Sequence, residues 1–231
     1  MAKTFHEPDC NQCKDRIEVF KVLEEEHLKK IEKIRFDVLF HAGEIIFKQG
    51  TPFTHTICIL EGLAKVYLEA GNKRRFILTL VGPGEMIGSP GMFIDEMHHF
   101  SVSAVEDSVA CFLQKEIIEE IIVTNNRFAT ELLKKANKRD IRNFQRFLSL
   151  TRKQAPGRLA ETLLFLYHEI YKTNPFKLTV SRQDLADMSA TTKENAIRTL
   201  KVFKEEGLIS MTGSLVTILN ERLLQNISAN G

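Results

Sequence analysis

The side chains best suited to recognising another molecule lie close together near the C-terminal end of the sequence. Between residues 192 and 198 the chain offers a hydroxyl, an ammonium, a carboxylate, an amide and a guanidinium group, on Thr192, Lys193, Glu194, Asn195 and Arg198. In the major groove of DNA, arginine pairs with guanine, glutamate accepts from cytosine and asparagine pairs with adenine. Arg182, which precedes this group, suits a backbone phosphate. This set predicts DNA contacts, provided that a helix presents it outward.

Two helix-start signals predict the elements that must present these side chains. Ser181–Asp184 has the form of a capping box with Ser181 as the N-cap, and we interpret Thr191–Glu194 as a second capping box. The first signal opens a helix over residues 183–188, and the second opens a helix that ends at Gly207 in the C′ position. Two capped helices joined by so short a turn form a helix-turn-helix motif, whose second helix enters the major groove.

Apolar residues give both predicted helices an inner face. Leu185 and Ala186 face inward from the first helix, and the inward residues of the second are Ala196, Ile197, Leu200 and Phe203. Two further apolar runs, separated by Thr212-Gly213-Ser214, predict a two-stranded wing. The alternative is an amphipathic helical pair with a solvated charged face. The caps, the wing and the basic surroundings favour DNA binding.

The charge is polarised along the chain, although the net charge is +2. The segment from Lys134 to Ser210 holds 16 Lys and Arg against 8 Asp and Glu, a net charge of +8. The remainder holds 16 against 22, a net charge of −6. A basic region beside an acidic one suits binding to a phosphate backbone, because each neutralised phosphate releases counterions.

The segment from Phe40 to Leu113 has a different character. Short apolar runs alternate with turn signals about every eight to twelve residues, which is typical of an antiparallel barrel or sandwich. From Lys115 to Leu150 the chain then lacks glycine and proline, and its residues favour a helix. Pro156 suits the first turn of a further helix, which Asn174-Pro175 ends.

The predicted long helix carries one apolar stripe, formed by Phe128, Leu132, Leu133, Ala136, Ile141, Phe144 and Leu148. A helix of this length cannot bury such a stripe against a small β-domain alone. We interpret the stripe as a dimer seam between two copies of the chain. A connector between domains is the alternative.

These patterns predict an α+β protein with four parts. The expected parts are an N-terminal arm (1–24), an antiparallel β-roll of the jelly-roll type (25–113), a long dimerisation helix (114–150) and a winged helix-turn-helix domain (151–231). The sequence has no run of 18 apolar residues, and its first residues lack the apolar core of a signal peptide. We therefore expect a cytoplasmic protein without a membrane partner.

Known catalytic spacings are missing from the sequence. We find no Ser/His/Asp arrangement, phosphate-binding loop or zinc-hydrolase motif, so we do not expect an enzyme. A DNA-binding regulator is the main hypothesis. The alternative is a ligand-binding β-roll that regulates a partner protein without binding DNA.

Three glycine-centred motifs resemble the cyclic-nucleotide-binding roll of the Crp/Fnr transcription regulators. They are Phe40-x-x-Gly43-Glu44-x-x-Phe47-x-x-Gly50, Leu60-Glu61-Gly62 and Gly82-Pro83-Gly84-Glu85-x-x-Gly88. The run from Ser181 to Ala186, Lys193-Glu194-x-x-x-Arg198-x-Leu200 and Glu206-Gly207-Leu208-Ile209 resemble the same family's helix-turn-helix. The resemblance implies a homodimer that binds a two-fold DNA site and RNA polymerase, with Glu194 and Arg198 at base edges. The family usually has Ser or Gly where this chain has Ile197.

The expected effector pocket departs from the family pattern. Members that bind cyclic AMP have Gly-Glu-Leu followed by an Arg-Ser pair, whereas this chain has Gly88-Ser89-Pro90 and then His98-His99. The carboxylate for the ribose and the cation for the phosphate are both missing. Because burying a phosphodiester without a charge partner is costly, we do not expect cyclic AMP to be the effector. Gly88, Ser89, His98 and His99 remain candidate pocket residues, and ordinary loop histidines are the alternative.

Three cysteines offer a second kind of signal. Cys10 and Cys13 form a CxxC pair, and with Cys111 they match three of the four cluster ligands of the oxygen-sensing members of the family. The fourth position falls near Val19, which cannot bind iron, although Asp15 or Glu18 could substitute. An iron–sulfur cluster, a disulfide or other thiol switch, and cysteines with a packing role alone all remain open, and the cofactor is unknown.

Overall fold

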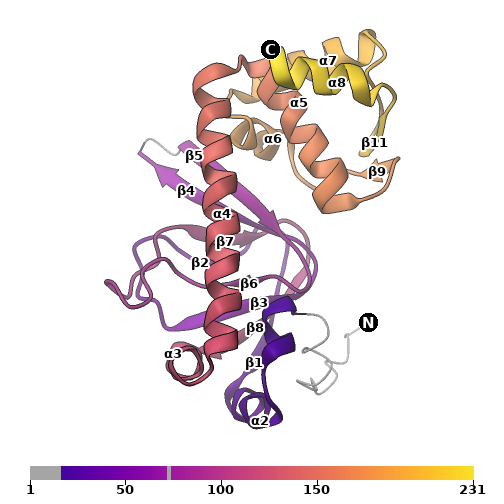
Figure 1. The fold of residues 1–231 in the computed structure, drawn as a ribbon. Helices are drawn as coiled ribbons and strands as arrows, with labels where there is room; N and C mark the ends of the chain where they lie inside the picture. The colour runs from indigo at the N-terminus through magenta and orange to yellow at the C-terminus, as the bar shows by residue number, and fades with distance from the viewer. Residues whose placement is uncertain (1–16, 72–73) are drawn as a thin grey trace, which may run out of the picture. The chain divides into compact units, whose positions relative to one another are not determined.

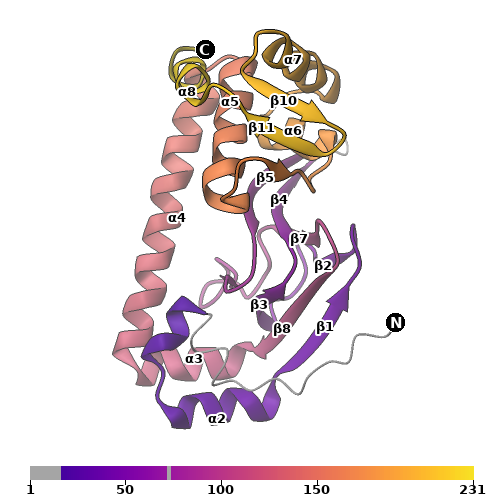
Figure 2. The same cartoon turned by 90° about the vertical axis from the view of Figure 1, so that its right-hand side faces the viewer.

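The structure is a computed structural model that describes residues 17–71 and 74–231 (Figures 1 and 2). The described residues fall into two compact units. The first comprises the described part of Met1–Val66 together with Val81–Arg139, and the second comprises Tyr67–Leu80 and Asp140–Gly231, apart from the two residues left out. None of the described helices is long and apolar enough to cross a membrane.

Within residues 36–71 and 74–114, eight strands form the β-roll. They are β1 (Phe36–Phe40), β2 (Ile45–Phe47), β3 (His55–Glu61), β4 (Ala64–Ala70), β5 (Arg74–Val81), β6 (Met86–Ile87), β7 (Ser101–Ala104) and β8 (Ser108–Gln114). One sheet has the order β1-β8-β3-β6 and the other β2-β7-β4-β5. Gly62 forms the tight turn after β3 with φ +81°, where a Cβ would lie 2.4 Å from the Asp107 carbonyl oxygen. The alternating pattern of apolar runs and turn signals therefore predicted the β-region correctly.

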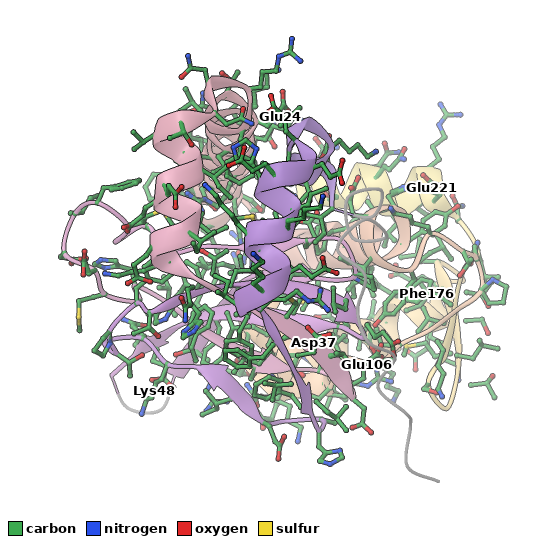
Figure 3. All side chains as sticks on the ribbon, turned by 90° about the horizontal axis from the view of Figure 1, so that it is seen from below. Glu24, Asp37, Lys48, Glu106, Phe176 and Glu221 are labelled. Carbon is green, nitrogen blue, oxygen red and sulfur yellow. The ribbon has the colours of Figure 1, made fainter. Side chains whose placement is uncertain are left out.

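Helical segments cover one face of the first sheet. These segments are the short helix η1 (Glu18–Val22), α2 (Glu25–Ile34) and α3 (Lys115–Thr124), and Figure 3 shows α2 and α3 side by side. Their buried apolar residues include Phe20, Ile31 and Ile118, which belong to one core cluster with Cys58 and Cys111 of the sheet. This buried face accounts for the apolar spacing of these segments.

The expected single helix over residues 114–150 is wrong, because the structure has two helices there. α3 ends at Thr124 and α4 (Asn126–Arg152) begins two residues later. Asn125 lies between them with extended backbone: its N–H donates to Ile121 O (2.8 Å), and its Oδ1 accepts from Phe128 N–H (3.0 Å). One asparagine thus ends one helix and caps the next, and helix-forming composition alone does not reveal this.

The apolar stripe of α4 changes from buried to exposed along the helix. Phe128 is fully buried, whereas the exposed large residues of the helix are Leu133 (61%), Ile141 (55%), Phe144 (68%), Phe147 (67%) and Leu148 (50%). Phe147 was not among the residues assigned to the stripe from the sequence. A solvated row of aromatic and aliphatic side chains of this size is unusual for a chain without a partner.

The second unit contains the predicted winged helix-turn-helix. It consists of α5 (Ala155–Phe165) with Pro156 in its first turn, the π-helical turn η2 (Leu166–Tyr171), β9 (Phe176–Lys177), α6 (Arg182–Met188), α7 (Lys193–Glu205), β10 (Ile209–Thr212), β11 (Leu215–Ile218) and α8 (Glu221–Asn230). The wing is a three-stranded sheet in the order β10-β11-β9. Neither β9 nor α8 was predicted from the sequence. The expected fold class is confirmed.

Candidate nucleic-acid interface and effector site

The predicted capping box at the start of α6 is confirmed. The Asp184 N–H donates to Ser181 Oγ (3.0 Å), and the Ser181 N–H donates to Asp184 Oδ2 (3.0 Å). Leu185 and Ala186 are fully buried, as the sequence predicted. Arg182 follows the cap directly and keeps part of its surface exposed. The cap therefore fixes the backbone direction from which the Arg182 side chain leaves the helix.

The second predicted capping box is wrong in its register. The N-cap of α7 is Thr192 rather than Thr191, and its Oγ1 accepts from the Asn195 N–H (3.2 Å). Glu194 consequently lies at the second helical position and cannot return a hydrogen bond to the cap. It is an exposed acidic residue of the first turn. Because Glu194 does not act as a capping residue, its carboxylate is available for an external partner.

Asn195 connects the start of α7 to Arg198. Its Nδ2 donates to Thr191 Oγ1 (2.7 Å), and its Oδ1 accepts from Arg198 Nη2 (2.8 Å). Each end of the amide therefore makes one hydrogen bond within the protein, whereas the sequence predicted that Asn195 itself faces a base. The Arg198 side chain is exposed, and Asn195 fixes the direction of its guanidinium group.

The inner face of α7 differs from the prediction at one residue. Ala196, Leu200 and Phe203 are buried, but Ile197 is 46% exposed. Ile197 lies one position before Arg198, and at about 100° per residue it belongs to the outer flank of the helix. Gly207 has φ +69°, as the predicted C′ position requires.

Basic side chains surround this flank, and two of them, Lys201 and Lys204, were not predicted from the sequence. A hollow of about 190 Å³ is lined by Arg182, Ile197, Leu200, Lys201, Lys204 and Met211. Arg182 comes from α6, whereas Lys201 and Lys204 come from α7, at the three-residue spacing that places them on one face. Lys201 and Lys204 extend the predicted interface from the start of α7 toward the wing.

Two arginines from other helices donate hydrogen bonds to the turn between α6 and α7. Arg146 of α4 donates through Nη2 to Met188 O, and Arg158 of α5 donates through Nε to Ser189 O (2.8 Å) and through Nη2 to Ala190 O (3.1 Å). These carbonyls lie at the C-terminal end of α6, where a cation is favourable. Sequence reasoning identified neither arginine, because their acceptors are backbone atoms far along the chain.

Arg146 also contacts β5, a strand that largely belongs to the same unit. Its Nη1 donates to Leu78 O (3.2 Å), and its guanidinium carbon lies 4.6 Å from the centre of the Phe76 ring. Burial lowers the pKa of Arg146 to about 10, so the side chain remains charged at neutral pH. One guanidinium group therefore joins α4, β5 and α6.

The four predicted effector-pocket residues have different surroundings. Gly88 follows β6, and Ser89 is engaged within its own loop, where its Oγ donates to Met97 O (2.6 Å) and accepts from Gly91 N–H (3.1 Å). His99 is exposed, and its Nε2 lies 3.0 Å from Asp95 Oδ2. Ser89 and His99 therefore each have a partner within the loop that contains them.

His98 is the buried member of the predicted set. It is 5% exposed, its ring stacks on Phe47 with centroids 3.9 Å apart, and it meets Phe53 edge-on at 5.3 Å. Its Nδ1 has no hydrogen-bond partner among the described residues. Burial lowers the pKa of His98 to about 4, so the imidazole is neutral at pH 7.

Of the three predicted redox or metal cysteines, Cys10 and Cys13 lie outside the described residues. Cys111 is 2% exposed and faces Cys58 of β3 and Asp37 of β1 across the sheet. Burial, followed by the neighbouring Cys58, raises the pKa of the Cys111 thiol, which disfavours the thiolate that a metal requires. Within residues 17–71 and 74–231, no group of three or more His, Cys, Asp or Glu could hold a metal ion. The described residues alone do not fit a cluster.

Two family models match the chain. The cyclic nucleotide-binding domain matches residues 37–125, and the Crp-like helix-turn-helix domain matches residues 157–227. The chain is 26% identical over 192 residues to Electron transport regulator A of Shewanella oneidensis, covering 81% of this chain and 76% of that protein. It is 25% identical over 229 residues to the nitrogen fixation regulation protein FixK of Bradyrhizobium diazoefficiens, covering 95% and 94%.

Solved structures agree with these sequence matches. FixK2 from Bradyrhizobium japonicum is similar with a TM-score of 0.78 at 21% identity, covering 86% of this chain and 99% of that one. A regulator of the crp/fnr family from Eubacterium rectale has a TM-score of 0.73 at 19% identity, covering 92% and 98%. At these identities the likeness concerns the fold.

Proposed function

This chain belongs to the Crp/Fnr family of transcription regulators, and on that premise we propose that it binds DNA as a homodimer under the control of a signal received by the β-roll. The observation that carries the proposal is the outward start of α7. There Glu194 and Arg198 are exposed on a capped helix, and Asn195 orients Arg198. A capped recognition helix with oriented side chains suits the major groove.

Six residues make up the proposed DNA-binding site: Arg182, Thr192, Lys193, Glu194, Asn195 and Arg198. Glu194 and Arg198 are assigned to base edges, because a carboxylate accepts from cytosine and a guanidinium pairs with guanine. Arg182 and Lys193 are assigned to phosphates. Asn195 is assigned a positioning role through Arg198, since its Oδ1 accepts from the guanidinium group.

The exposed stripe of α4 supports the homodimer. Ile141, Phe144 and Phe147 are each more than half exposed, and they lie on one helix. A second copy of the same helix would bury this stripe in the manner of a coiled coil. A dimer would also present two recognition helices, which suits a DNA site with two half-sites about 34 Å apart.

The proposed action is regulation of transcription through DNA and RNA polymerase, rather than catalysis. A protein that acts on DNA in this way is expected in the cytoplasm. The signal itself stays a prediction: a ligand in the roll, an iron–sulfur cluster and a thiol switch are the candidates. The absorbance spectrum of anaerobically purified protein, with iron and sulfide analysis, separates the cluster from the other two.

A selection of binding sites from a random duplex library, followed by gel shifts, tests the function. The selected site should be a two-fold repeat, and its affinity should fall steeply between 50 and 200 mM salt. Arg198→Ala should lose about 1–3 kcal/mol of specific binding at one base pair in each half-site. Arg222→Ala, an exposed arginine on α8, is the matched control and should bind as the wild type does. Absence of any salt-dependent duplex binding would overturn the proposal.

A further inference from the structure

The β-roll contains a cavity of about 370 Å³ away from Gly88 and Ser89. Its lining comes from β2, the loop that follows it, the beginning of β3, and one residue each from β8 and the segment before β7. The lining residues are Ile45, Ile46, Phe47, Lys48, Thr51, Pro52, Thr54, His55, Ile57, His98 and Phe112. All of them belong to the first unit. A volume of this size accommodates a ligand of one or two rings.

Aromatic rings form much of the cavity wall. His98 and Phe47 are stacked with an interplanar angle of 16°, and Phe112, from the other sheet, is stacked on Phe36 at 9°. His55 meets the Phe112 ring edge-on at 5.9 Å. Planar ring faces and edges favour a planar ring as the occupant over a branched aliphatic group of similar size.

The polar groups of the cavity define the rest of the ligand. His98 is neutral at pH 7 and 95% buried, and its unpartnered Nδ1 leaves the imidazole with unused hydrogen-bonding capacity. Lys48, which Figure 3 labels at the edge of the roll, is exposed at the rim of the cavity. Its ammonium group forms no ion pair with a residue in the described ranges 17–71 and 74–231, and none of the described lining residues is acidic.

We propose that this cavity is the effector site and that it binds a planar aromatic carboxylate, with the ring between the Phe47–His98 stack and Phe112 and the carboxylate at Lys48. The proposal rests on the proposed regulatory role of the roll and names the ligand class for it. One lysine at an open rim suits a single exposed carboxylate. A cyclic phosphodiester held inside the roll would need a buried cation, which this lining does not supply.

Binding of 2-naphthoate to the full-length protein tests the ligand class by isothermal titration calorimetry, with the uncharged 2-naphthamide and the non-planar cyclohexanecarboxylate as comparisons. We expect saturable 2-naphthoate binding and at least about 10-fold weaker binding of both comparison compounds. Lys48→Gln should weaken 2-naphthoate about 10-fold and leave 2-naphthamide unchanged. Lys33→Gln, an exposed lysine of α2 outside the cavity, is the matched control and should change neither.

His98→Phe keeps an aromatic ring in the stack and removes nitrogen atoms to which the naphthalene ring offers no hydrogen-bonding group, so it should change 2-naphthoate binding by less than about 2-fold while the circular dichroism spectrum is retained. The proposal is overturned if 2-naphthoate does not bind at 1 mM, if 2-naphthamide binds equally well, or if Lys33→Gln acts as Lys48→Gln does. Gel shifts with the same preparations distinguish failure of the ligand proposal from failure of the proposed regulatory function. Duplex binding without 2-naphthoate binding refutes the ligand alone, whereas absence of duplex binding under all conditions refutes the regulator.

Discussion

The DNA-binding region and the β-roll differ in how their functional residues are distributed along the chain. The proposed DNA contacts lie within residues 182–198, and local caps orient them. The cavity of the roll combines residues 45–57 with His98 and Phe112, which only the paired sheets bring together. A recognition helix can therefore be identified from local sequence, whereas an effector cavity depends on long-range strand pairing.

The two regions also differ in their use of polar groups. In the helix-turn-helix the amide of Asn195 has hydrogen bonds at both ends. In the roll the His98 Nδ1 is buried without a partner among the described residues. The amide of Asn195 holds a neighbouring side chain in place, whereas the His98 Nδ1 lies beside a cavity with its hydrogen-bonding capacity unused.

The largest effect is expected at the exposed apolar stripe of α4, the proposed dimer seam. Phe144→Glu places a charge in the proposed dimer seam and should convert the dimer into a monomer. Because a monomer engages one half-site, its affinity for a two-fold site should fall more than about 100-fold. Light scattering coupled to size-exclusion chromatography and gel shifts measure the two effects. Lys138→Glu, an exposed control on the same helix, should remain dimeric; a dimeric Phe144→Glu protein would contradict the seam.

The next effect tests whether the helix-turn-helix depends on contacts from outside its own segment. Arg146→Gln removes the donors to Met188 O and Leu78 O and should lower the free energy of unfolding by about 2–3 kcal/mol. Urea unfolding of this variant and of Arg142→Gln, an exposed arginine one turn earlier, makes the comparison. Equal stability of the two variants would mean that the helix-turn-helix does not depend on the hydrogen bonds of Arg146.

A smaller effect is expected in the roll at low pH. Since His98 has a pKa of about 4 when folded and about 6.5 when unfolded, the unfolded state binds the proton first. Stability is fully present above pH 6.5 and falls as the pH decreases toward 4, by about 1–2 kcal/mol at pH 5. Thermal unfolding between pH 5 and 8 measures this loss. His98→Phe should reduce the slope, and an unchanged slope would assign it to other groups.

The smallest effect sharpens the description of the recognition helix. Asn195→Ala frees the Arg198 guanidinium group and should weaken binding to the selected site by about 3- to 10-fold. If Asn195 positions Arg198, discrimination should relax at the base pair that Arg198→Ala also affects. Relaxation at a different base pair would show that Asn195 reads a base itself. Asn143→Ala, on α4, is the control, and competition gel shifts with single-base variants give the answer.

Local signals in the sequence determined the β-region, the wing and the helix-turn-helix. The Ser181 cap, Gly207 and the inward Leu185 and Leu200 follow from short-range rules about side chains and backbone, and the structure confirms them. The same rules failed where two adjacent residues could serve the same purpose. Thr191 and Thr192 are both possible caps, and the packing of α7 selects Thr192.

Only the tertiary structure decided the features that join distant segments. The break at Asn125, the carbonyl contacts of Arg146 and Arg158, and the isolation of His98 between Phe47 and Phe53 involve partners that no local pattern specifies. A backbone carbonyl or an aromatic face is present at nearly every position, so sequence cannot indicate which one a side chain meets. Residue type and spacing thus determined the DNA-binding helix, and strand pairing and helix packing determined what surrounds it.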